Sequence, residues 1–316
     1  MKSYANRVKV TSARCRGKKL HARDAPHVPD ISNLDGVREA CRICVLCMHA
    51  ASDAIGTGYA LDGSQVEELV AQVMLKNRAH SGSMCDTADF DACCCVSVNE
   101  VAAHAVPTSQ RFAPGDVIKV DVVVHLQGYM GDMARTLFFD PPKIDTDIVR
   151  LYDINQRVVL KTILELNSRL SKSPHTLTYA EIGKVLKSSV DVCRAEHRDF
   201  RWTALEDLCG HRIGKKMHIR PWICMRDVAS SSFETELVRE HDTFCIEPVC
   251  CLGDVAHGTL NEQHEIVAAD LSTHFEVTCG VKRSLEGSLQ IVCLTFTDFD
   301  LSEFESVSEC GMVSAE

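Results

Sequence analysis

The segment 117–139 constrains the fold of this chain more than any other stretch of its sequence. Its first part is a run of β-branched residues around Asp121, which predicts a buried strand. Gln127-Gly128 supplies a turn, and the residues that follow, including Asp132, predict the returning strand of a hairpin. A reversal centred just before Gln127 places Asp121 directly opposite Asp132.

Two opposed aspartates create an electrostatic problem that the fold must solve. Directly opposed Cβ atoms lie about 4.5–5.5 Å apart, so two negative charges at these positions destabilise a sheet. Either the pair shares a proton, or a bound metal ion neutralises both carboxylates. The hairpin therefore predicts an acidic dyad or a metal site.

The composition is that of an ordinary globular protein. Of the 316 residues, 45% are hydrophobic and 25% are charged, and no uninterrupted apolar stretch reaches the ~20 residues of a membrane helix. The formal net charge of −10 argues against bulk nucleic-acid binding by the folded body. With no apolar signal-peptide core, the 17 cysteines are expected to be reduced thiols in a cytoplasmic protein.

The two ends of the chain carry opposite charge. Residues 1–23 hold eight Lys and Arg and no acid, whereas 298–316 hold six acids and no Lys or Arg. We expect a mobile basic arm over 1–29, a folded domain over 30–297 and an acidic tail over 298–316. The arm could contact the ribosome, and its composition also suits a mitochondrial presequence. We expect a monomer that does not bind membranes.

Hydrophobic periodicity predicts helices in four segments, and β-branched runs predict further strands beside the hairpin. The helices are expected at 34–54, 65–76, 145–171 and 179–196, and the strands at 93–98, 243–251 and 275–281. This order indicates an α+β protein with two similar halves, the second beginning near Pro141-Pro142.

Further acids and a histidine occur in strand-like or turn-like sequence. His211 is flanked by glycines, Glu247 ends an apolar run before a proline, and Glu276 interrupts another apolar strand. A carboxylate in an apolar strand is costly unless it is paired or bound to a metal. With the two aspartates, these residues form a set of four carboxylates and one imidazole, which suits two divalent ions about 3.5–4 Å apart.

Several motifs, in this order, resemble those of type I methionine aminopeptidases. They are 97–107, which contains His104, then Gly131-Asp132, then Gly210-His211 through His218 to Pro221, then Ile246-Glu247-Pro248, and finally 272–278. The resemblance covers roughly residues 30–285 and includes all five metal-ligand positions of that family. It implies the pita-bread (creatinase/aminopeptidase) fold, in which two pseudo-symmetric halves surround a curved antiparallel sheet.

The resemblance also implies a ligand set for two divalent ions, which could be Co, Mn, Fe or Zn. Asp132 and Glu276 would bridge the ions, Asp121 would bind one, and His211 and Glu247 would bind the other. The implied activity is removal of an N-terminal methionine from a peptide or a nascent chain.

The implied catalytic residues are His104, His218 and Glu247. Glu247 would carry the proton from the attacking water to the leaving amine, His218 would stabilise the oxyanion, and His104 would contact the scissile amide. For the methionine pocket, the matching positions are Phe90, Cys95 and Met217 together with His104.

Some positions depart from the family pattern. Ala105 and Arg212 replace glycines, Met217 replaces an aromatic residue, and Val277 replaces a histidine. Arg212 adds bulk and charge directly after a ligand position, so a non-catalytic scaffold that binds protein or RNA is an alternative. An Xaa-Pro peptidase of the same fold is another, although such enzymes usually carry an additional N-terminal domain.

The cysteines suggest two further interpretations, neither of which we favour. The C-x2-C spacing at 41–47 has no second half for a structural zinc site, and it lies in a predicted helix. The three consecutive cysteines at 93–95 alternate across a strand and cannot all bind one ion. No Cys–His signature of a thiol hydrolase is present.

Overall fold

A computed structural model describes residues 33–86, 90–173, 176–226, 235–285 and 287–295. The predicted basic arm over 1–29 and the acidic tail over 298–316 lie outside these described residues. Among the described helices, none combines the length and the apolar character needed to cross a membrane.

The centre of the molecule is a nine-stranded sheet in which all pairings are antiparallel. Across the sheet the order is β1 (His80–Ser81), β4 (Val117–Leu126), β5 (Tyr129–Phe138), β14 (Glu276–Arg283), β9 (Thr243–Ile246), β7 (Gly210–Arg212) and β8 (Ile219–Ile223). Two further strands branch from this path, β2 (Cys95–Val98) on β4 and β15 (Leu289–Cys293) on β14.

Two small sheets complete the strand structure of the described residues. One contains β13 (Ser272–His274), β10 (Val249–Leu252) and β6 (Trp202–Ala204), and the other contains β11 (Thr259–Leu260), β12 (Ile266–Val267) and β3 (Val101–Ala103). The single strand expected over 243–251 is divided into β9 and β10, because Pro248 cannot donate a ladder hydrogen bond.

All four predicted helices are confirmed. They are α2 (Asn33–Gly56), α3 (Gly63–Lys76), α5 (Thr146–Lys172) and α6 (Tyr179–Glu196), and a short α4 (Gly82–Asp86) and a 3₁₀ turn at Pro141–Lys143 accompany them. Side chains satisfy free N–H groups at the helix starts: Asp62 caps α3, Asp145 caps α5, and Thr178 forms a capping box with Glu181 at α6.

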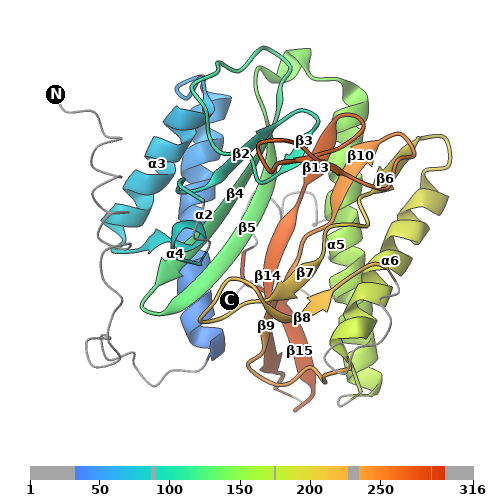
Figure 1. The fold of residues 1–316 in the computed structure, drawn as a ribbon. Coiled ribbons are helices and arrows are strands. Elements are labelled where there is room, and N and C mark those ends of the chain that lie inside the picture. The colour runs from blue at the N-terminus through green and yellow to red at the C-terminus, as the bar shows by residue number, and fades with distance from the viewer. Residues whose placement is uncertain (1–32, 87–89, 174–175, 227–234, 286, 296–316) are drawn as a thin grey trace.

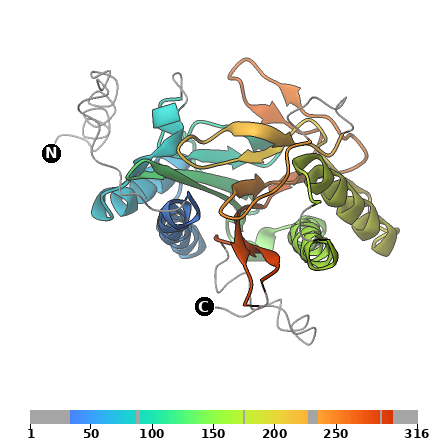
Figure 2. The same ribbon diagram turned by 90° about the horizontal axis from the view of Figure 1, so that it is seen from below.

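The helices divide into two pairs, one for each half of the molecule (Figure 1). The pair α2 and α3 packs beside β4 and β5, and the pair α5 and α6 packs beside the later strands. Seen from below, α2 and α5 both lie on the same side of the central sheet (Figure 2). The 3₁₀ turn at Pro141–Lys143 separates the halves in the sequence, at the predicted position.

Each half buries its own apolar core. In the first half, Ile43 and Met48 of α2 pack with Val120, Val122 and Met133 of the hairpin. In the second half, a larger cluster joins α5 and α6 to strands β9 and β14, and includes Leu166, Leu186, Phe244 and Val277. The two halves meet where β5 pairs with β14.

The register of the predicted hairpin is wrong by two residues. Gln127 and Gly128 both have positive φ, 49° and 89°, so they are the central residues of the turn and Leu126 pairs with Tyr129. As a result Asp121 lies opposite Ala134, and Asp132 lies opposite Val123. A shift of two preserves the alternation of side chains, so Asp121 and Asp132 are diagonal neighbours on the same face of the sheet.

Buried polar contacts hold the two halves together beside that face. The Thr278 hydroxyl accepts a hydrogen bond from the Asp132 N–H at 3.2 Å and donates one to the Asp132 carbonyl at 2.7 Å. The Arg135 guanidinium donates to the Glu276 carbonyl and lies 4.0 Å from the centre of the Phe275 ring. The backbone around Asp132 and Glu276 is therefore fixed from both sides.

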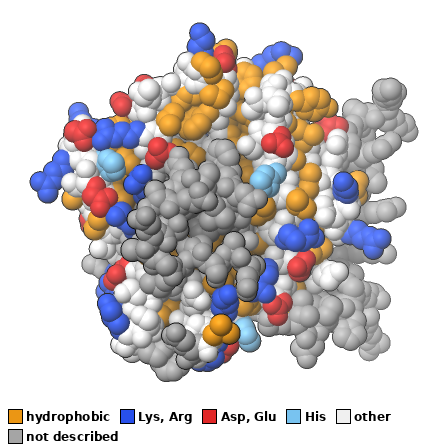
Figure 3. Space-filling model, turned by 180° about the vertical axis from the view of Figure 1, so that it is seen from behind, with side chains coloured by type: hydrophobic (Ala, Val, Ile, Leu, Met, Phe, Trp, Pro, Cys, Tyr) orange, Lys and Arg blue, Asp and Glu red, His pale blue; other side chains and the backbone are white. Residues whose placement is uncertain are grey.

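The outer surface carries charges of both signs. On the face shown in Figure 3, acidic and basic side chains of the described residues are interspersed with apolar ones. No patch of a single sign dominates the described part of this face.

Candidate metal centre

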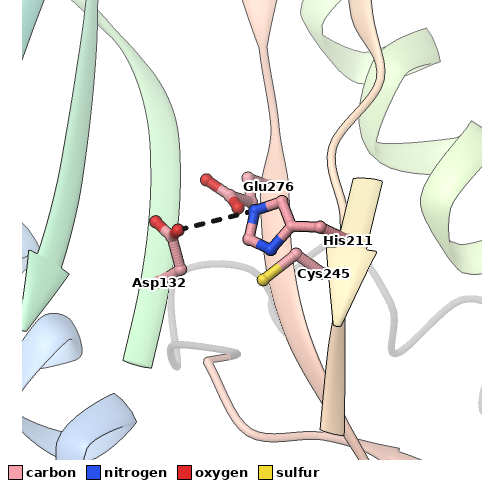
Figure 4. A group of neighbouring side chains, drawn as sticks. All are labelled: Asp132, His211, Cys245 and Glu276. Atoms are coloured by element: carbon pink, nitrogen blue, oxygen red, sulfur yellow. Dashed lines mark ion pairs between the residues drawn. The ribbon is translucent and has the colours of Figure 1, made fainter. Parts of the chain in front are cut away.

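Four side chains from four strands of the central sheet meet beside the seam between the halves (Figure 4). They are Asp132 of β5, His211 of β7, Cys245 of β9 and Glu276 of β14, all buried. One ligand atom from each lies within 4.8 Å of the others. Three of the four are residues that the sequence predicted as metal ligands, and Cys245 was not predicted.

The other two predicted ligands lie around this group. The Glu247 Oε1 atom is 3.3 Å from His211 Nε2, and Glu247 follows β9 directly. Asp121 shares a face of the hairpin with Asp132, and electrostatic and hydrogen-bond interactions link their carboxyl groups. All five predicted ligands are thus brought to one place.

The ring of His211 is oriented for metal binding. Its Nδ1 atom lies 3.1 Å from the Arg212 carbonyl, and because a carbonyl can only accept, Nδ1 carries the hydrogen. The Nε2 lone pair then points toward Glu247 and toward Asp132, whose Oδ2 atom is 3.9 Å away. Burial, and then the charge of His218, lower the pKa of His211 to about 3, so the ring is neutral.

Burial disfavours the charged form of all four carboxyl groups. Desolvation raises the pKa of Asp121 to about 6. Desolvation, followed by the charges of neighbouring carboxylates, raises the pKa values of Asp132, Glu247 and Glu276 well above the ordinary range. Such a concentration of acid is stable when ionised only if positive charge compensates it.

The polar atoms of the site fit a divalent ion. Asp121 Oδ1, Asp132 Oδ1 and Glu247 Oε1 are buried and receive no hydrogen bond from the described residues. Carboxylate oxygens and a neutral imidazole nitrogen are ligands of hard and borderline divalent metals. A cation satisfies these atoms together, whereas a proton shared between two aspartates would satisfy only one pair.

The two predicted histidines lie at the exposed edge of the centre. His218 is exposed, and its ring stands edge-on to that of His211 with the centroids 4.5 Å apart. His104 follows β3 with φ of 68°, a left-handed conformation that a histidine rarely adopts. The surrounding protein, and then the charge of His218, lower the pKa of His104, which indicates that the two rings are neighbours.

The predicted pocket residues have different surroundings. Met217 is buried in an apolar cluster with Met130, Ile213 and Cys245, directly beside the metal centre. Cys95 lies opposite Asp121 in the pairing of β2 with β4, and its thiol hydrogen-bonds that carboxylate. Phe90 is half-buried next to residues outside the described part of the chain, and its role stays a prediction.

Arg212 lies away from the metal centre, contrary to the concern that its charge would disturb the ligands. It follows His211 on β7, where the pairing with β8 is irregular, and its contacts place its side chain on the side of the strand away from the ligands. There its guanidinium pairs with Glu236 at 3.1 Å and with Asp242 at 3.3 Å, and lies 5.3 Å from the centre of the Tyr179 ring. The argument for a non-catalytic scaffold therefore loses its basis.

Sequence reasoning missed two buried residues near the centre. Cys245 stands two residues before Glu247, and strand alternation could have placed it on the ligand face. His274 ends β13 two residues before Glu276, and neither of its ring nitrogens has a hydrogen-bond partner among the described residues. Nothing in the sequence distinguishes His274 from a histidine with a purely structural role.

The fold and the site define a protein with a sheet shared by two halves and a buried carboxylate–histidine centre suited to divalent metal. The sequence matches metallopeptidase family M24 over residues 35–282. The chain belongs to this family, and its architecture is the pita-bread fold.

Curated relatives include methionine aminopeptidases of plants and yeast. Methionine aminopeptidase 1C of Arabidopsis thaliana, named as chloroplastic/mitochondrial, is 24% identical over 243 residues, which are 77% of this chain and 64% of that protein. Methionine aminopeptidase 1 of Schizosaccharomyces pombe is 24% identical over 69% of this chain and 54% of the relative. The chain spans less than two thirds of the length of these relatives.

Solved structures show the same fold. The methionine aminopeptidase of Rickettsia prowazekii superposes with a TM-score of 0.68 at 20% identity, over 84% of this chain and 97% of that one. The prolidase of Pyrococcus furiosus superposes with a TM-score of 0.53 at 16% identity, over 84% of this chain and 64% of that one.

Proposed function

We propose that this protein is a dimetal aminopeptidase that removes N-terminal methionine from peptides or nascent chains. One observation carries the proposal. The five predicted ligands, from both halves of the molecule, lie together, and three of their buried carboxylate oxygens have no hydrogen-bond partner among the described residues. The methionine aminopeptidases among the relatives, and the match to the chain's own motifs, support the choice of substrate.

The ligands would hold two divalent ions. Asp132 and Glu276 would be shared, Asp121 would complete one site, and His211 with Glu247 would complete the other. The ions, which could be Co, Mn, Fe or Zn, would supply the positive charge that activates water and polarises an amide carbonyl. The Nδ1–H bond of His211 to a carbonyl holds the ring in the tautomer that this role requires.

The remaining steps fall to side chains of this chain. Glu247, partly exposed beside His211, would take a proton from the attacking water and give it to the leaving amine as the C–N bond breaks. The exposed His218 would donate a hydrogen bond to the oxygen of the tetrahedral centre, and His104 would contact the peptide on the departing side. Met217 and Cys95 would line the pocket for the methionine side chain.

The biological setting is part of the same proposal. Nascent chains would be the substrates, and a ribosome contact through the basic arm would bring the enzyme to them. A cytoplasmic location agrees with the cysteine content, whereas the relatives named as chloroplastic/mitochondrial favour an organelle. Localisation of a tagged full-length chain distinguishes these compartments.

The proposal is tested by peptide turnover and metal analysis on the same preparation. We expect the chain loaded with Mn, Co, Fe or Zn to release methionine from Met-Ala-Ser and to leave the N-acetylated peptide intact. Asp132→Asn should reduce turnover at least about 100-fold, because it removes the charge of a shared ligand. Asp191→Asn, at an exposed position on α6, is the matched control and should not change turnover.

Three results would contradict the proposal. Wild-type turnover by Asp132→Asn would mean that the ligand set is wrong. Cleavage of Ala-Pro-Ser in preference to Met-Ala-Ser would indicate an Xaa-Pro peptidase. Bound metal without turnover of either peptide would indicate a non-catalytic scaffold.

A further inference from the structure

Cys245 places a thiol among ligands that are otherwise oxygen and nitrogen. On β9 it lies opposite Thr278 of β14, and Glu276 stands two residues from Thr278 on the same face. The Cys245 Sγ atom is within 4.8 Å of ligand atoms of Asp132, His211 and Glu276, and it points into the group that these residues form (Figure 4).

The hydrogen bonds around Cys245 leave its sulfur lone pairs free. Its Sγ atom is 3.5 Å from the Thr278 hydroxyl oxygen, but that hydroxyl already donates its one hydrogen to the Asp132 carbonyl. Thr278 therefore has no hydrogen to give to the sulfur, and the single thiol hydrogen is shared between the Thr278 oxygen and the Glu276 carboxylate. The sulfur lone pairs therefore receive no hydrogen bond from Thr278.

A simpler interpretation is that Cys245 is a small buried hydrophobe, as many cysteines are. It does pack against Ile213 and Met217. Other buried cysteines of the chain fit this description fully: Cys279, for example, lies in the large apolar core of the second half. Cys245 differs because its sulfur also faces two carboxylates and an imidazole, and one of these carboxylates, Asp132, has a buried oxygen without a hydrogen-bond partner among the described residues.

The distances allow one ion to reach all four side chains. Metal–sulfur bonds of about 2.3 Å and metal–nitrogen or metal–oxygen bonds of about 2.0–2.2 Å place the ligand atoms of a tetrahedral site about 3.4–3.6 Å apart. The four atoms lie within 4.8 Å of one another, so movements of up to about 1 Å bring them to one ion. Side-chain rotation alone can supply such a movement.

We propose that the thiol of Cys245 is a ligand of the ion shared by Asp132, His211 and Glu276. The proposal rests on the metal centre of the proposed function and adds a sulfur donor to it. The thiol releases its proton to solvent when it binds the ion. A thiolate favours Zn, Co(II) and Cd over Mn and Mg, so Cys245 would shift the metal preference of the site toward softer ions.

The test uses spectroscopy of the Co(II)-loaded and Zn-loaded full chain. We expect the wild-type Co(II) protein to show a near-ultraviolet sulfur-to-cobalt charge-transfer band. Cys245→Ser should lose this band, keep the visible cobalt bands, and lower Cd affinity at least about 10-fold while Mn affinity stays within about threefold. Cys279→Ser, the same change at a buried thiol outside the site, is the matched control and should retain the band.

A second measurement needs no variant, so the test stands even if Cys245→Ser fails to fold. X-ray absorption of the Zn-loaded wild type should show a zinc–sulfur distance of about 2.3 Å among nitrogen and oxygen scatterers, with an average of about one sulfur for every two zinc ions. Only nitrogen and oxygen scatterers, or a charge-transfer band that survives in Cys245→Ser, would overturn the inference.

The outcomes separate this inference from the proposed activity. A sulfur ligand in a protein that does not cleave peptides supports the inference and contradicts the activity. Peptide cleavage by a protein whose metal has no sulfur ligand supports the activity and contradicts the inference. Failure of the wild type to bind Co(II), Zn or Cd at all would contradict both.

Discussion

His211 and Arg212 are neighbours on one short strand, and their side chains have opposite surroundings although the pairing with β8 is irregular between them. His211 points toward the acidic centre, while Arg212 pairs with Glu236 and Asp242 behind it. The sequence could single out the candidate ligands, because carboxylates in apolar strands are costly without a cation. The direction of Arg212 could not be predicted, because the pairing of the strand is irregular between His211 and Arg212.

Arg212 should contribute to stability and not to metal binding. Arg212→Met removes the positive charge that pairs with two partly buried carboxylates, so we expect the free energy of unfolding in urea to fall by about 1–3 kcal/mol. Metal affinity and peptide turnover should stay within about threefold, less than 1 kcal/mol. Arg150→Met, which removes an exposed pair with Asp199, should cost little. Loss of metal affinity at unchanged stability would show that Arg212 acts on the centre.

At the scale of elements, long helices and the hairpin were predictable and the short strands were not. A helix such as α5 repeats its apolar positions over many turns, whereas β6 and β7 have three residues each and no periodicity to detect. Their positions are set by distant partners, β10 and β9, which local sequence does not specify. The predicted register of the hairpin was wrong because of its turn, where positive φ at both Gln127 and Gly128 determines which residues pair.

The contact between α2 and β5 should depend on Gly131. A Cβ atom at this position would lie 2.6 Å from the Cys41 nitrogen and 2.9 Å from the Ala40 carbonyl carbon, both backbone atoms of α2. Gly131→Ala must therefore push the helix from the strand beside Asp132, and we expect a loss of about 1–3 kcal/mol in unfolding free energy together with weaker metal binding. Gly56→Ala at the end of α2 meets no atom within 4 Å and is the control. Equal stability of the two variants would refute this account of the packing.

For the whole molecule, the sequence predicted the fold, and it singled out candidate ligands without giving their arrangement. Asp121 and Asp132 come from the first half, and His211, Glu247 and Glu276 come from the second. Their approach depends on the pairing of β5 with β14, between segments far apart in the chain. Cys245 was missed for the same reason, because a thiol becomes a candidate ligand only when its neighbours across the sheet are known.

The acidic centre should make metal binding strongly dependent on pH. A carboxyl whose pKa is raised by folding contributes its full stabilisation of the folded protein below its ordinary pKa of about 4, and this stabilisation is lost as pH rises to the folded value. The pKa of Asp121 is raised to about 6, and those of Asp132, Glu247 and Glu276 lie well above the ordinary range. The metal-free protein therefore holds protons that an ion must displace, so affinity should increase from pH 6 to pH 8.

The measurement is the melting temperature of loaded protein minus that of metal-free protein across this range. The difference removes the opposite contribution of Lys119, whose pKa burial lowers to about 7 and which favours folding as pH rises above that value. His211 stays neutral throughout and should release no proton. A difference that does not change with pH would mean that the carboxyl groups are ionised without metal.

Because the candidate ligands come from both halves, a bound ion would cross-link the two halves where β5 pairs with β14. Each half has its own apolar core, so loss of the ion leaves α2 and α5 packed as before. Loss of the ion removes a cross-link that closes very long loops, and the protein contacts between the halves, among them the pairing of β5 with β14, must then offset the closure entropy. In the metal-free protein, amide hydrogen exchange should therefore quicken first along these two strands, while the helices keep their protection.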